Sequence, residues 1–320
     1  MWKTILRRFL VMIPQLFVLS LLIFIMAKFM PGDPFTGAIS PETDPSRIEE
    51  LREIHGLNDP WYQQYVRWLG NAVQGEFGTS YTFQQPVANL IGDRALNTFW
   101  LSLLTTVFLY LIAIPLGVLA GRYQNSLFDR AVVLYSFVTY AIPLFVLALI
   151  FIYFFAFQLG WFPAMGSEDI RVETGSLAWY WSKLYHMLLP AITSAILGTT
   201  TVIQFLRSEV IDAKAMDYVR TARSKGVPSS KVYTRHILRN SLLPIAAFFG
   251  FTITSLLGGS IFIETIFGYP GMGKLFIQAI GSRDYSIITA LVLLYGFLTL
   301  LGSLLSDIIM TIVDPRIRIE

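Results

Sequence analysis

Six long apolar runs constrain this chain more than any other feature. Each holds about 20 residues or more, the length that a helix needs to cross the hydrocarbon core of a bilayer. The runs cover approximately residues 9–29, 99–120, 131–157, 184–206, 242–267 and 286–306. Lipid offers no partner to free backbone groups, so such runs are expected to be helices, whereas a β-barrel would show short alternating segments. The sequence therefore predicts an all-α integral membrane protein with six transmembrane helices.

The composition excludes several classes of active site. The 320 residues are 54% hydrophobic and 14% charged, whereas a soluble domain is usually about a quarter charged. The absence of Cys excludes a disulfide framework, an iron–sulfur cluster and a thiolate nucleophile or metal site. His55, His186 and His236 are far apart in the sequence, and no second ligand type stands near them at metal-site spacing. We therefore expect no metal, no cofactor and no catalytic residue.

The distribution of Lys and Arg predicts the orientation. With the N-terminus in the cytoplasm, the inner segments carry 15 Lys and Arg residues and the outer segments carry nine over a longer stretch. Cytoplasmic loops of membrane proteins carry such an excess. The first run has no small-residue cleavage site after Met30, so we interpret it as a retained helix and not as a signal peptide. Both termini are thus predicted to be cytoplasmic.

The chain divides into four parts by this topology. They are the first transmembrane helix (1–30), a small helical extracytoplasmic subdomain (31–94), a domain of five transmembrane helices (95–312) and a cytoplasmic tail (313–320). In the outer subdomain, Ser46 and Glu49 have the spacing of a capping box, and Asp59-Pro60 offers a second helix start. Aromatic residues at helical spacing follow Pro60; they either dock on a partner or pack within the subdomain and at the membrane interface.

The loop of residues 207–240 carries eight basic residues. By charge alone it is either an ordinary positive-inside segment or a phosphate or nucleic-acid site. The pattern indicates a short helix that ends in glycine, followed by a second amphipathic helix from Ser230 to Asn240. A short helix at a loop tip, with small residues, suits close docking by another protein. The candidate docking residues are Asp217, Tyr218, Val219, Arg220, Thr221, Ala222, Arg223, Lys225 and Gly226.

This helix–glycine segment resembles the coupling loop of type I ABC importer permeases, in the version found in oligopeptide and dipeptide permeases. The general pattern is Glu-Ala-Ala, three residues, Gly, then nine more and Ile-x-Leu-Pro. Ala222 and Gly226 match it, whereas Arg220 and Thr221 stand at the Glu and first Ala positions. The Leu-Pro pair comes five residues late, at Leu243, which fits the peptide branch better than the sugar branch.

Three further stretches extend the resemblance over nearly the whole chain. They are residues 56–80, the Glu-Thr-Ile-Phe-Gly-Tyr-Pro-Gly-Met-Gly stretch that begins at Glu264, and residues 313–318. The long outer segment after the first helix is similar to that of the first, B-type permease of a pair.

The resemblance implies a set of partners. They are a second, C-type permease, two cytoplasmic ATPases that bind the coupling loops, and an extracellular or periplasmic binding protein that delivers peptide. It also implies a prokaryotic plasma membrane, with lipid around the helices and no nucleic acid. The chain has no Gly-x-x-x-x-Gly-Lys-[Ser/Thr] phosphate loop, so ATP hydrolysis is expected in the partners and not in this chain.

Two acidic residues close to the apolar runs remain open to more than one interpretation. Glu264 either lines the outer mouth of the pathway, where it meets a peptide amino group, or serves as a structural partner of Lys274 or Arg283, or is simply exposed. Asp307 is interpreted as a boundary residue that pairs with an arginine, with a pathway role as the alternative.

The outer surface offers a candidate docking site for the binding protein, centred on Tyr269, Pro270 and Gly271. Gly-Tyr-Pro-Gly cannot continue a helix, so a turn is predicted there. Ile266, Phe267 and Tyr269 beside the turn are expected to leave apolar area near water, which often marks a contact site. Alternatively, the turn caps the approach to the sixth helix and packs against the permease partner.

Two other functional classes fit the sequence less well. A secondary transporter or channel would favour ionisable residues in mid-span, paired broken helices or a filter sequence, and the spans show almost none of these. A membrane-embedded metalloprotease would need His-Glu-x-x-His, which is absent. Within the permease class, dipeptides, nickel or another small solute are alternatives to oligopeptides.

Overall fold

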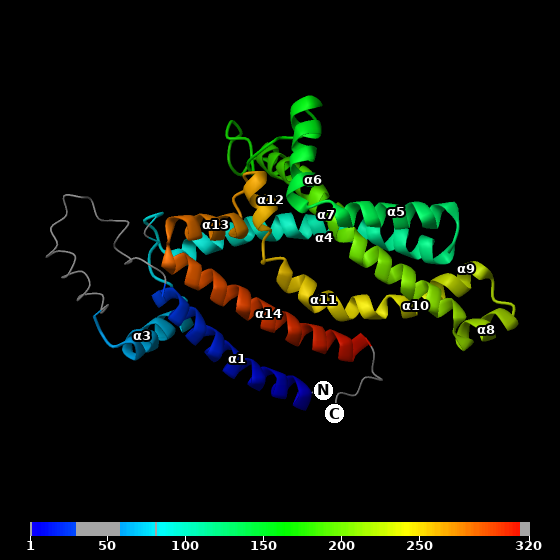
Figure 1. The fold of residues 1–320 in the computed structure, drawn as a ribbon, viewed down its shortest axis with the longest axis horizontal. Coiled ribbons are helices and arrows are strands. Elements are labelled where there is room, and N and C mark those ends of the chain that lie inside the picture. The colour runs from blue at the N-terminus through cyan, green and yellow to red at the C-terminus, as the bar shows by residue number, and fades with distance from the viewer. Residues whose placement is uncertain (1, 30–57, 81, 314–320) are drawn as a thin grey trace.

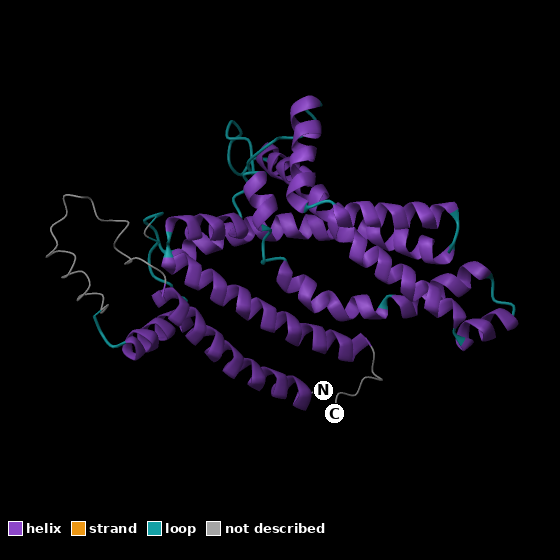
Figure 2. Ribbon diagram, viewed as in Figure 1, coloured by secondary structure: helices purple, strands orange, loops and turns teal. Residues whose placement is uncertain are grey.

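The computed structural model describes residues 2–29, 58–80 and 82–313, and in these the regular secondary structure is helical (Figure 2). The elements before the long central helix are α1 (Trp2–Phe29), α3 (Trp61–Val73), α4 (Val87–Arg122), α5 (Leu127–Ala141), α6 (Leu144–Phe151) and the π-helix η1 (Ile152–Gln158). The elements that follow are α7 (Leu177–Ala215), α8 (Asp217–Ser224), α9 (Ser229–Lys231), the π-helix η2 (Val232–Ile237), α10 (Leu238–Ser241), α11 (Leu243–Ser255), α12 (Ile261–Ile266), α13 (Met272–Ser282) and α14 (Tyr285–Val313). The predicted all-α class is confirmed.

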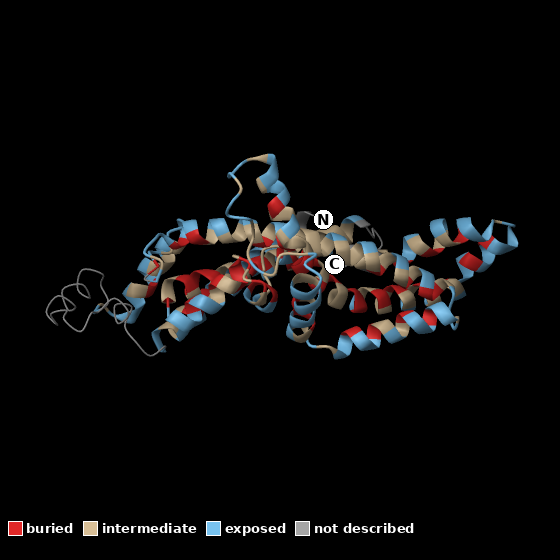
Figure 3. Cartoon of the chain, turned by 90° about the horizontal axis from the view of Figure 1, so that it is seen from above, coloured by how far each residue is buried: buried red, intermediate tan, exposed pale blue. Residues whose placement is uncertain are grey.

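The helices form an elongated bundle (Figure 1). The most extensive helix–helix contact joins α4 to α7, and α14 packs against both α11 and α1. At one end of the bundle lie α8 and α9, and α3 lies at the opposite end (Figure 1). The segment of α6 and η1 projects from the side of the bundle. In Figure 3 the buried residues follow the lines where helices meet.

Four of the six predicted runs lie in helices that are long and apolar enough to cross a membrane. These helices are α1, α4, α7 and α14. Many large apolar side chains on them are exposed, among them Leu10 and Leu111. Exposed apolar surface on such helices is what a lipid environment requires.

The prediction of one continuous helix for each of the other two runs is wrong. The third run is divided into α5 and the α6–η1 segment, which meet at an angle of 100°. Pro143 lies at this bend, where a proline removes a backbone donor and disfavours helical geometry in the residue before it. The fifth run is divided into α11 and α12 around Gly259, whose φ of +69° lies in the left-handed region.

The contact between α4 and α7 depends on glycine. A Cβ atom added to Gly117 would lie 2.9 Å from the Cβ of Leu206, and one added to Gly121 would lie 2.7 Å from the Cβ of Val210. The two glycines are four residues apart, and so lie on the same face of α4, where small residues let membrane helices approach closely. The ammonium group of Lys214 donates a hydrogen bond to the carbonyl of Gly121 at 2.7 Å. The two helices are therefore held at a fixed, short separation.

A buried ion pair joins α5 to α7. The guanidinium of Arg207 donates to both carboxylate oxygens of Asp129, at 2.5 and 2.9 Å, and the Asp129 residue is only 2% exposed. Ser126 caps α5 by accepting from the backbone N–H of Asp129. Such a bidentate pair fixes orientation as well as distance.

Outside the long helices, α3 packs on α1 by its aromatic face. The hydroxyl groups of Tyr65 and Ser20 lie 2.8 Å apart, and the ring of Phe24 contacts both Tyr65 and Trp68. Tyr65 of the predicted stripe is buried against α1, whereas the sequence had suggested packing within the outer subdomain or at the membrane interface. The helix begins at Trp61, one residue later than predicted. The predicted helix after Ser46 lies outside the described residues.

The close approach of α4 and α7 gives a test of the fold. Gly121→Val should destabilise the protein by about 1–3 kcal/mol, because its side chain meets Val210 and the backbone of α7. The measurement is the temperature at which half of the detergent-solubilised protein survives heating as a monodisperse species. Gly92→Val is the matched control on the same helix, since a Cβ at Gly92 meets nothing within 4 Å. Equal melting temperatures for the two variants would contradict the packing.

Candidate functional site

The predicted docking helix exists as α8 and is anchored by one apolar face. Val219 and Ala222 are buried in it. They belong to a hydrophobic cluster that also contains Val210 and Ala213 of α7 and Val232 and Ile237 of η2. The helix is thus fixed to the end of α7, so that a force on α8 would be transmitted directly to that helix.

The opposite face of α8 is exposed and polar, and together with the residues that follow it carries more basic than acidic side chains. Among the candidate docking residues, the exposed ones are Asp217, Tyr218, Arg220, Thr221, Arg223, Lys225 and Gly226. The only acidic residue among these, Asp217, lies 3.6 Å from the guanidinium of Arg220. Gly226 ends the segment with a φ of +72°, and a Cβ there would meet nothing within 4 Å.

The second predicted amphipathic helix, from Ser230 to Asn240, is not a single regular helix. It consists of α9, the π-helix η2 and α10 in succession. The ring of Tyr233 in η2 lies under the guanidinium of Arg122, with 4.7 Å between the guanidinium carbon and the ring centroid. This contact ties the segment to the end of α4.

Glu264 belongs to α12, which lies well away from α8 (Figure 1). Its carboxylate is buried and accepts hydrogen bonds from the Thr98 hydroxyl at 3.0 Å, the Lys274 backbone N–H at 3.0 Å and the Ser260 backbone N–H at 3.3 Å. Lys274 is in the first turn of α13, so the carboxylate caps that helix and lies at the positive end of its dipole.

This arrangement decides part of what the sequence left open for Glu264. The interpretation as an exposed boundary residue is wrong, because none of its surface is accessible to solvent. The expected link to Lys274 exists through the backbone, while the Lys274 ammonium group donates to the carbonyl of Gly268 at 3.0 Å. Glycine surrounds the carboxylate, since a Cβ at Gly271 would lie 2.4 Å from the Glu264 Cδ. Asp307, the other acidic residue, forms the expected pair with an arginine, Arg8, at 3.1 Å.

The turn after α12 is packed into the protein. The expectation that Phe267 and Tyr269 expose apolar area is wrong, because the two residues are 2% and 3% exposed. The Tyr269 hydroxyl donates to the Asn97 carbonyl at 3.2 Å, and the Asn97 side-chain amide donates to the Pro270 carbonyl at 3.0 Å. Burial raises the pKa of the Tyr269 phenol above its ordinary value, so the group stays a hydrogen-bond donor.

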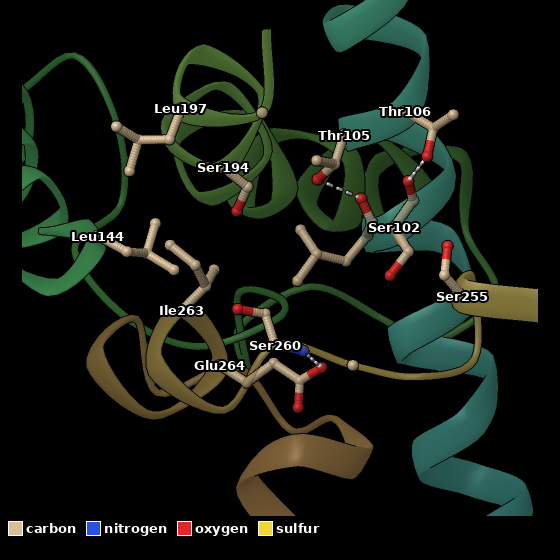
Figure 4. A pocket seen from close by; sticks show the side chains of 13 residues that line it. Ser102, Thr105, Thr106, Leu144, Ser194, Leu197, Ser255, Ser260, Ile263 and Glu264 are labelled. Atoms are coloured by element: carbon tan, nitrogen blue, oxygen red, sulfur yellow. Dashed lines mark hydrogen bonds between the residues drawn. The ribbon is translucent and has the colours of Figure 1, made fainter. Parts of the chain in front are cut away.

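Beside Glu264 lies a cavity of about 350 Å³, between α4, α7, the start of α6 and α12 (Figure 4). Its polar lining consists of Ser102, Thr105, Thr106, Ser194, Ser255, Ser260 and Glu264. Its apolar lining consists of Leu101, Leu144, Leu197 and Ile263, and Gly198 and Gly259 complete it. In Figure 4 Glu264 lies below Ser260, and Thr105 and Ser194 lie on the opposite side of the space. Such a cavity can hold a small polar group.

Sequence reasoning missed several residues of these sites. Thr98 gave no signal, because one threonine in an apolar run is unremarkable before its partners are known. Asp129 had a usable signal, since Ser126 stands three residues before it, as in a capping box. Asp284 also had one: it precedes α14, and its carboxylate accepts from the backbone N–H of Ile287. The same carboxylate accepts from Ser80 at 2.6 Å and so ties the outer segment to α14.

Comparison with protein families gives two adjoining matches. Residues 113–319 match the family described as "Binding-protein-dependent transport system inner membrane component". Residues 1–102 match the N-terminal family of the same membrane components. Together the matches cover the α8 segment and the lining of the cavity except Thr105 and Thr106.

Individual proteins are similar over nearly the full length. The oligopeptide transport system permease protein AppB of Bacillus subtilis is 41% identical over 315 residues, which are 98% of each chain. The glutathione transport system permease protein GsiC of Escherichia coli is 33% identical over 318 residues, 99% of each chain. Among solved structures, an inward-facing MetNI methionine ABC transporter has a TM-score of 0.54 and 18% identity, over 70% of this chain and 96% of that one. This last likeness concerns the fold alone.

Proposed function

Because this chain belongs to the family of binding-protein-dependent transport system inner membrane components, as a permease subunit of a type I ABC importer, we propose that it forms half of a pathway for oligopeptides. The observation that carries the proposal is α8, a short exposed helix fixed by Val219 and Ala222 to the end of the longest helix of the bundle. Its position suits the transfer of motion from a docked ATPase to α7.

The proposed mechanism uses four partners besides this chain. A C-type permease completes the pathway, two ATPases bind the coupling loops, and a binding protein delivers substrate at the outer surface. When ATP binding closes the ATPases, the two coupling loops are drawn together and the pathway changes from inward-open to outward-open. In this chain, residues 217–226 supply the contacts to the ATPase. Hydrolysis belongs to the partners, and this subunit is not an enzyme.

The substrate is proposed to be an oligopeptide. The support is the 41% identity to AppB, whose name specifies oligopeptides, over nearly the whole chain. A short peptide is also consistent with the glutathione permease GsiC, at 33% identity. The cavity beside Glu264 offers hydrogen-bonding groups for such a substrate. Dipeptides, nickel or another small solute remain the alternatives within the family.

We propose that the binding protein docks at the end of the bundle that carries α3 and α13. The turn of Tyr269, Pro270 and Gly271 stays a prediction as its centre. Since Tyr269 is buried, we expect the turn to act through its shape, while exposed residues of α13 such as Gln278 and Ser282 make the contacts.

The proposed topology has six spans in a bacterial plasma membrane, with both termini in the cytoplasm. The helices α1, α4, α7 and α14 supply four spans. We propose that α5 with its bent continuation, and α10 with α11, supply the other two. Residues 238–255 are then about 27 Å long at 1.5 Å per residue, close to the thickness of the hydrocarbon core.

Single-cysteine labelling tests this topology, because the chain has no cysteine of its own. In intact cells, an impermeant maleimide should label the Gln74→Cys variant, at the exposed end of α3. It should label the Ser229→Cys variant, next to α8, only after the membrane is permeabilised. Labelling in the reverse pattern would overturn the orientation.

A pair of substitutions at Gly226 tests the coupling role. Both Gly226→Ala and Gly226→Trp place an L-residue at a φ of +72° and so share the backbone cost, about 1 kcal/mol. Only tryptophan adds bulk on the exposed docking face. We expect Gly226→Trp to lower ATP-dependent uptake at least about tenfold relative to Gly226→Ala, because tight interfaces tolerate overpacking poorly. Equal uptake by the two variants at equal membrane abundance would show that α8 is not the docking element.

A further inference from the structure

Most hydroxyl groups of the cavity lining have the same hydrogen-bonding role. Four of them donate their only proton to a carbonyl of their own helix. The bonds run from Thr105 to Leu101 at 2.9 Å, from Thr106 to Ser102 at 2.8 Å, from Ser194 to Pro190 at 3.0 Å and from Ser255 to Thr252 at 2.8 Å. A hydroxyl that has donated its proton can only accept further hydrogen bonds. These four residues of the lining can therefore offer acceptors but no hydroxyl donors.

Glu264 gives the cavity its one ionisable side chain, because no Lys, Arg or His lines it. The carboxylate is held by the Thr98 hydroxyl and by backbone N–H groups of Ser260 and Lys274. These donors fix the position of the group. The remaining hydroxyls, of Ser102 and Ser260, can rotate to accept as well. A group that enters the cavity therefore meets hydrogen-bond acceptors, whose oxygen atoms carry partial negative charge.

From this lining we infer that the cavity is a binding site for a primary ammonium group, carried by the peptide as its amino terminus or as a lysine side chain. The inference rests on the proposed function, because a peptide is the ligand that carries such a group there. An ammonium group has three donors and no acceptor, which matches the lining. The volume of about 350 Å³ is that of a small-ligand site, so it takes one end of a peptide and not its whole length. Recognition of the amino terminus would be independent of the peptide sequence, whereas recognition of a lysine side chain would not.

The cavity does not have the composition of a divalent metal site. Over the described ranges 2–29, 58–80 and 82–313, no group of three or more His, Cys, Asp or Glu side chains comes together. One carboxylate with neutral hydroxyls suits a monovalent, hydrogen-bonding cation better than a hard divalent ion, which takes several carboxylate ligands.

Uptake of three peptides by the reconstituted complex tests the inference. The first peptide has a free amino terminus and no lysine, the second is its N-acetylated form, and the third is N-acetylated and carries one lysine. In the double variant Thr105→Val, Ser194→Ala, the uptake ratio of the first peptide to the second should fall at least about threefold relative to wild type. Because the same binding protein serves both complexes, its own selectivity cancels from this comparison. The third peptide shows which source of ammonium is used.

A matched control is available in α14. Thr299 is exposed and donates to the Tyr295 carbonyl at 2.8 Å, as the cavity threonines donate to theirs, but it lies outside the cavity. The Thr299→Val variant should keep the wild-type ratio. In the double variant, an unchanged ratio of the first peptide to the second together with an unchanged ratio of the third peptide to the second overturns the inference while leaving the proposed function intact. If the wild-type complex takes up none of the peptides, the proposed function fails instead.

Thiol labelling tests, in the absence of substrate, whether the cavity prefers cations to anions. In the Ser194→Cys variant the thiol is unique, and its rates with a cationic and an anionic methanethiosulfonate can be compared. The cation-to-anion rate ratio should exceed that of Ser282→Cys, on the exposed end of α13, at least about fivefold, because the acceptor oxygens of the lining favour a cation over an anion. A ratio no greater than that of the surface variant overturns the inference.

Discussion

The close contact of α4 with α7 is the constraint on which both functional regions depend. Gly117 and Gly121 leave no room for a side chain at this contact, so the helices are held at one separation. Towards one end, the same two helices supply most of the hydroxyl groups of the cavity, from Ser102 to Thr106 and at Ser194. Towards the other, the end of α7 carries the cluster that anchors α8. A movement of α8 therefore reaches the cavity through one rigid pair of helices.

Polar groups inside the bundle are paired in a way that fixes neighbouring elements to this pair. The Asp129–Arg207 ion pair attaches α5 to α7. The Lys214 ammonium group of α7 donates a hydrogen bond to a carbonyl at the end of α4. Near the cavity, Glu264 joins α12 to α4 through Thr98 and caps α13. Buried charges are costly unless they are paired and hydrogen-bonded, so each of these contacts specifies one arrangement. Among them, Glu264 also belongs to the lining of the cavity, which suits a role in transport as well as in structure.

The sequence predicted much of the fold because its strongest signal is the length of apolar runs. The helices α1, α4, α7 and α14, and the short helix α8 with its terminal Gly226, were all visible in it. Pro143 was visible as a possible kink, but Pro14, Pro115 and Pro190 also stand in apolar runs and lie inside α1, α4 and α7, so proline alone does not mark the bend. The break at Gly259 was not visible, because hydrophobicity does not report where an apolar segment changes direction. The predicted exposure of Tyr269 was also wrong. Whether a turn is buried depends on partners such as Asn97, which is 172 residues away in the chain.

The cavity was harder to predict for the same reason. Glu264 stood out as an acidic residue in an apolar run, but its partner Thr98 and the acceptor hydroxyl groups are scattered over three helices. Single Ser and Thr residues in a membrane helix usually bond to their own backbone, and here they do so as well. Only the three-dimensional arrangement shows that their remaining lone pairs converge on one space.

The central claim is that partner ATPases acting on α8 drive substrate through this subunit. The direct measurement uses proteoliposomes that contain this chain, its partner permease and the ATPases, with the binding protein and a labelled oligopeptide on the outer side. We predict uptake that requires hydrolysable ATP inside and persists when ionophores collapse the proton and sodium gradients. Uptake that is driven by an ion gradient without ATP would contradict the account.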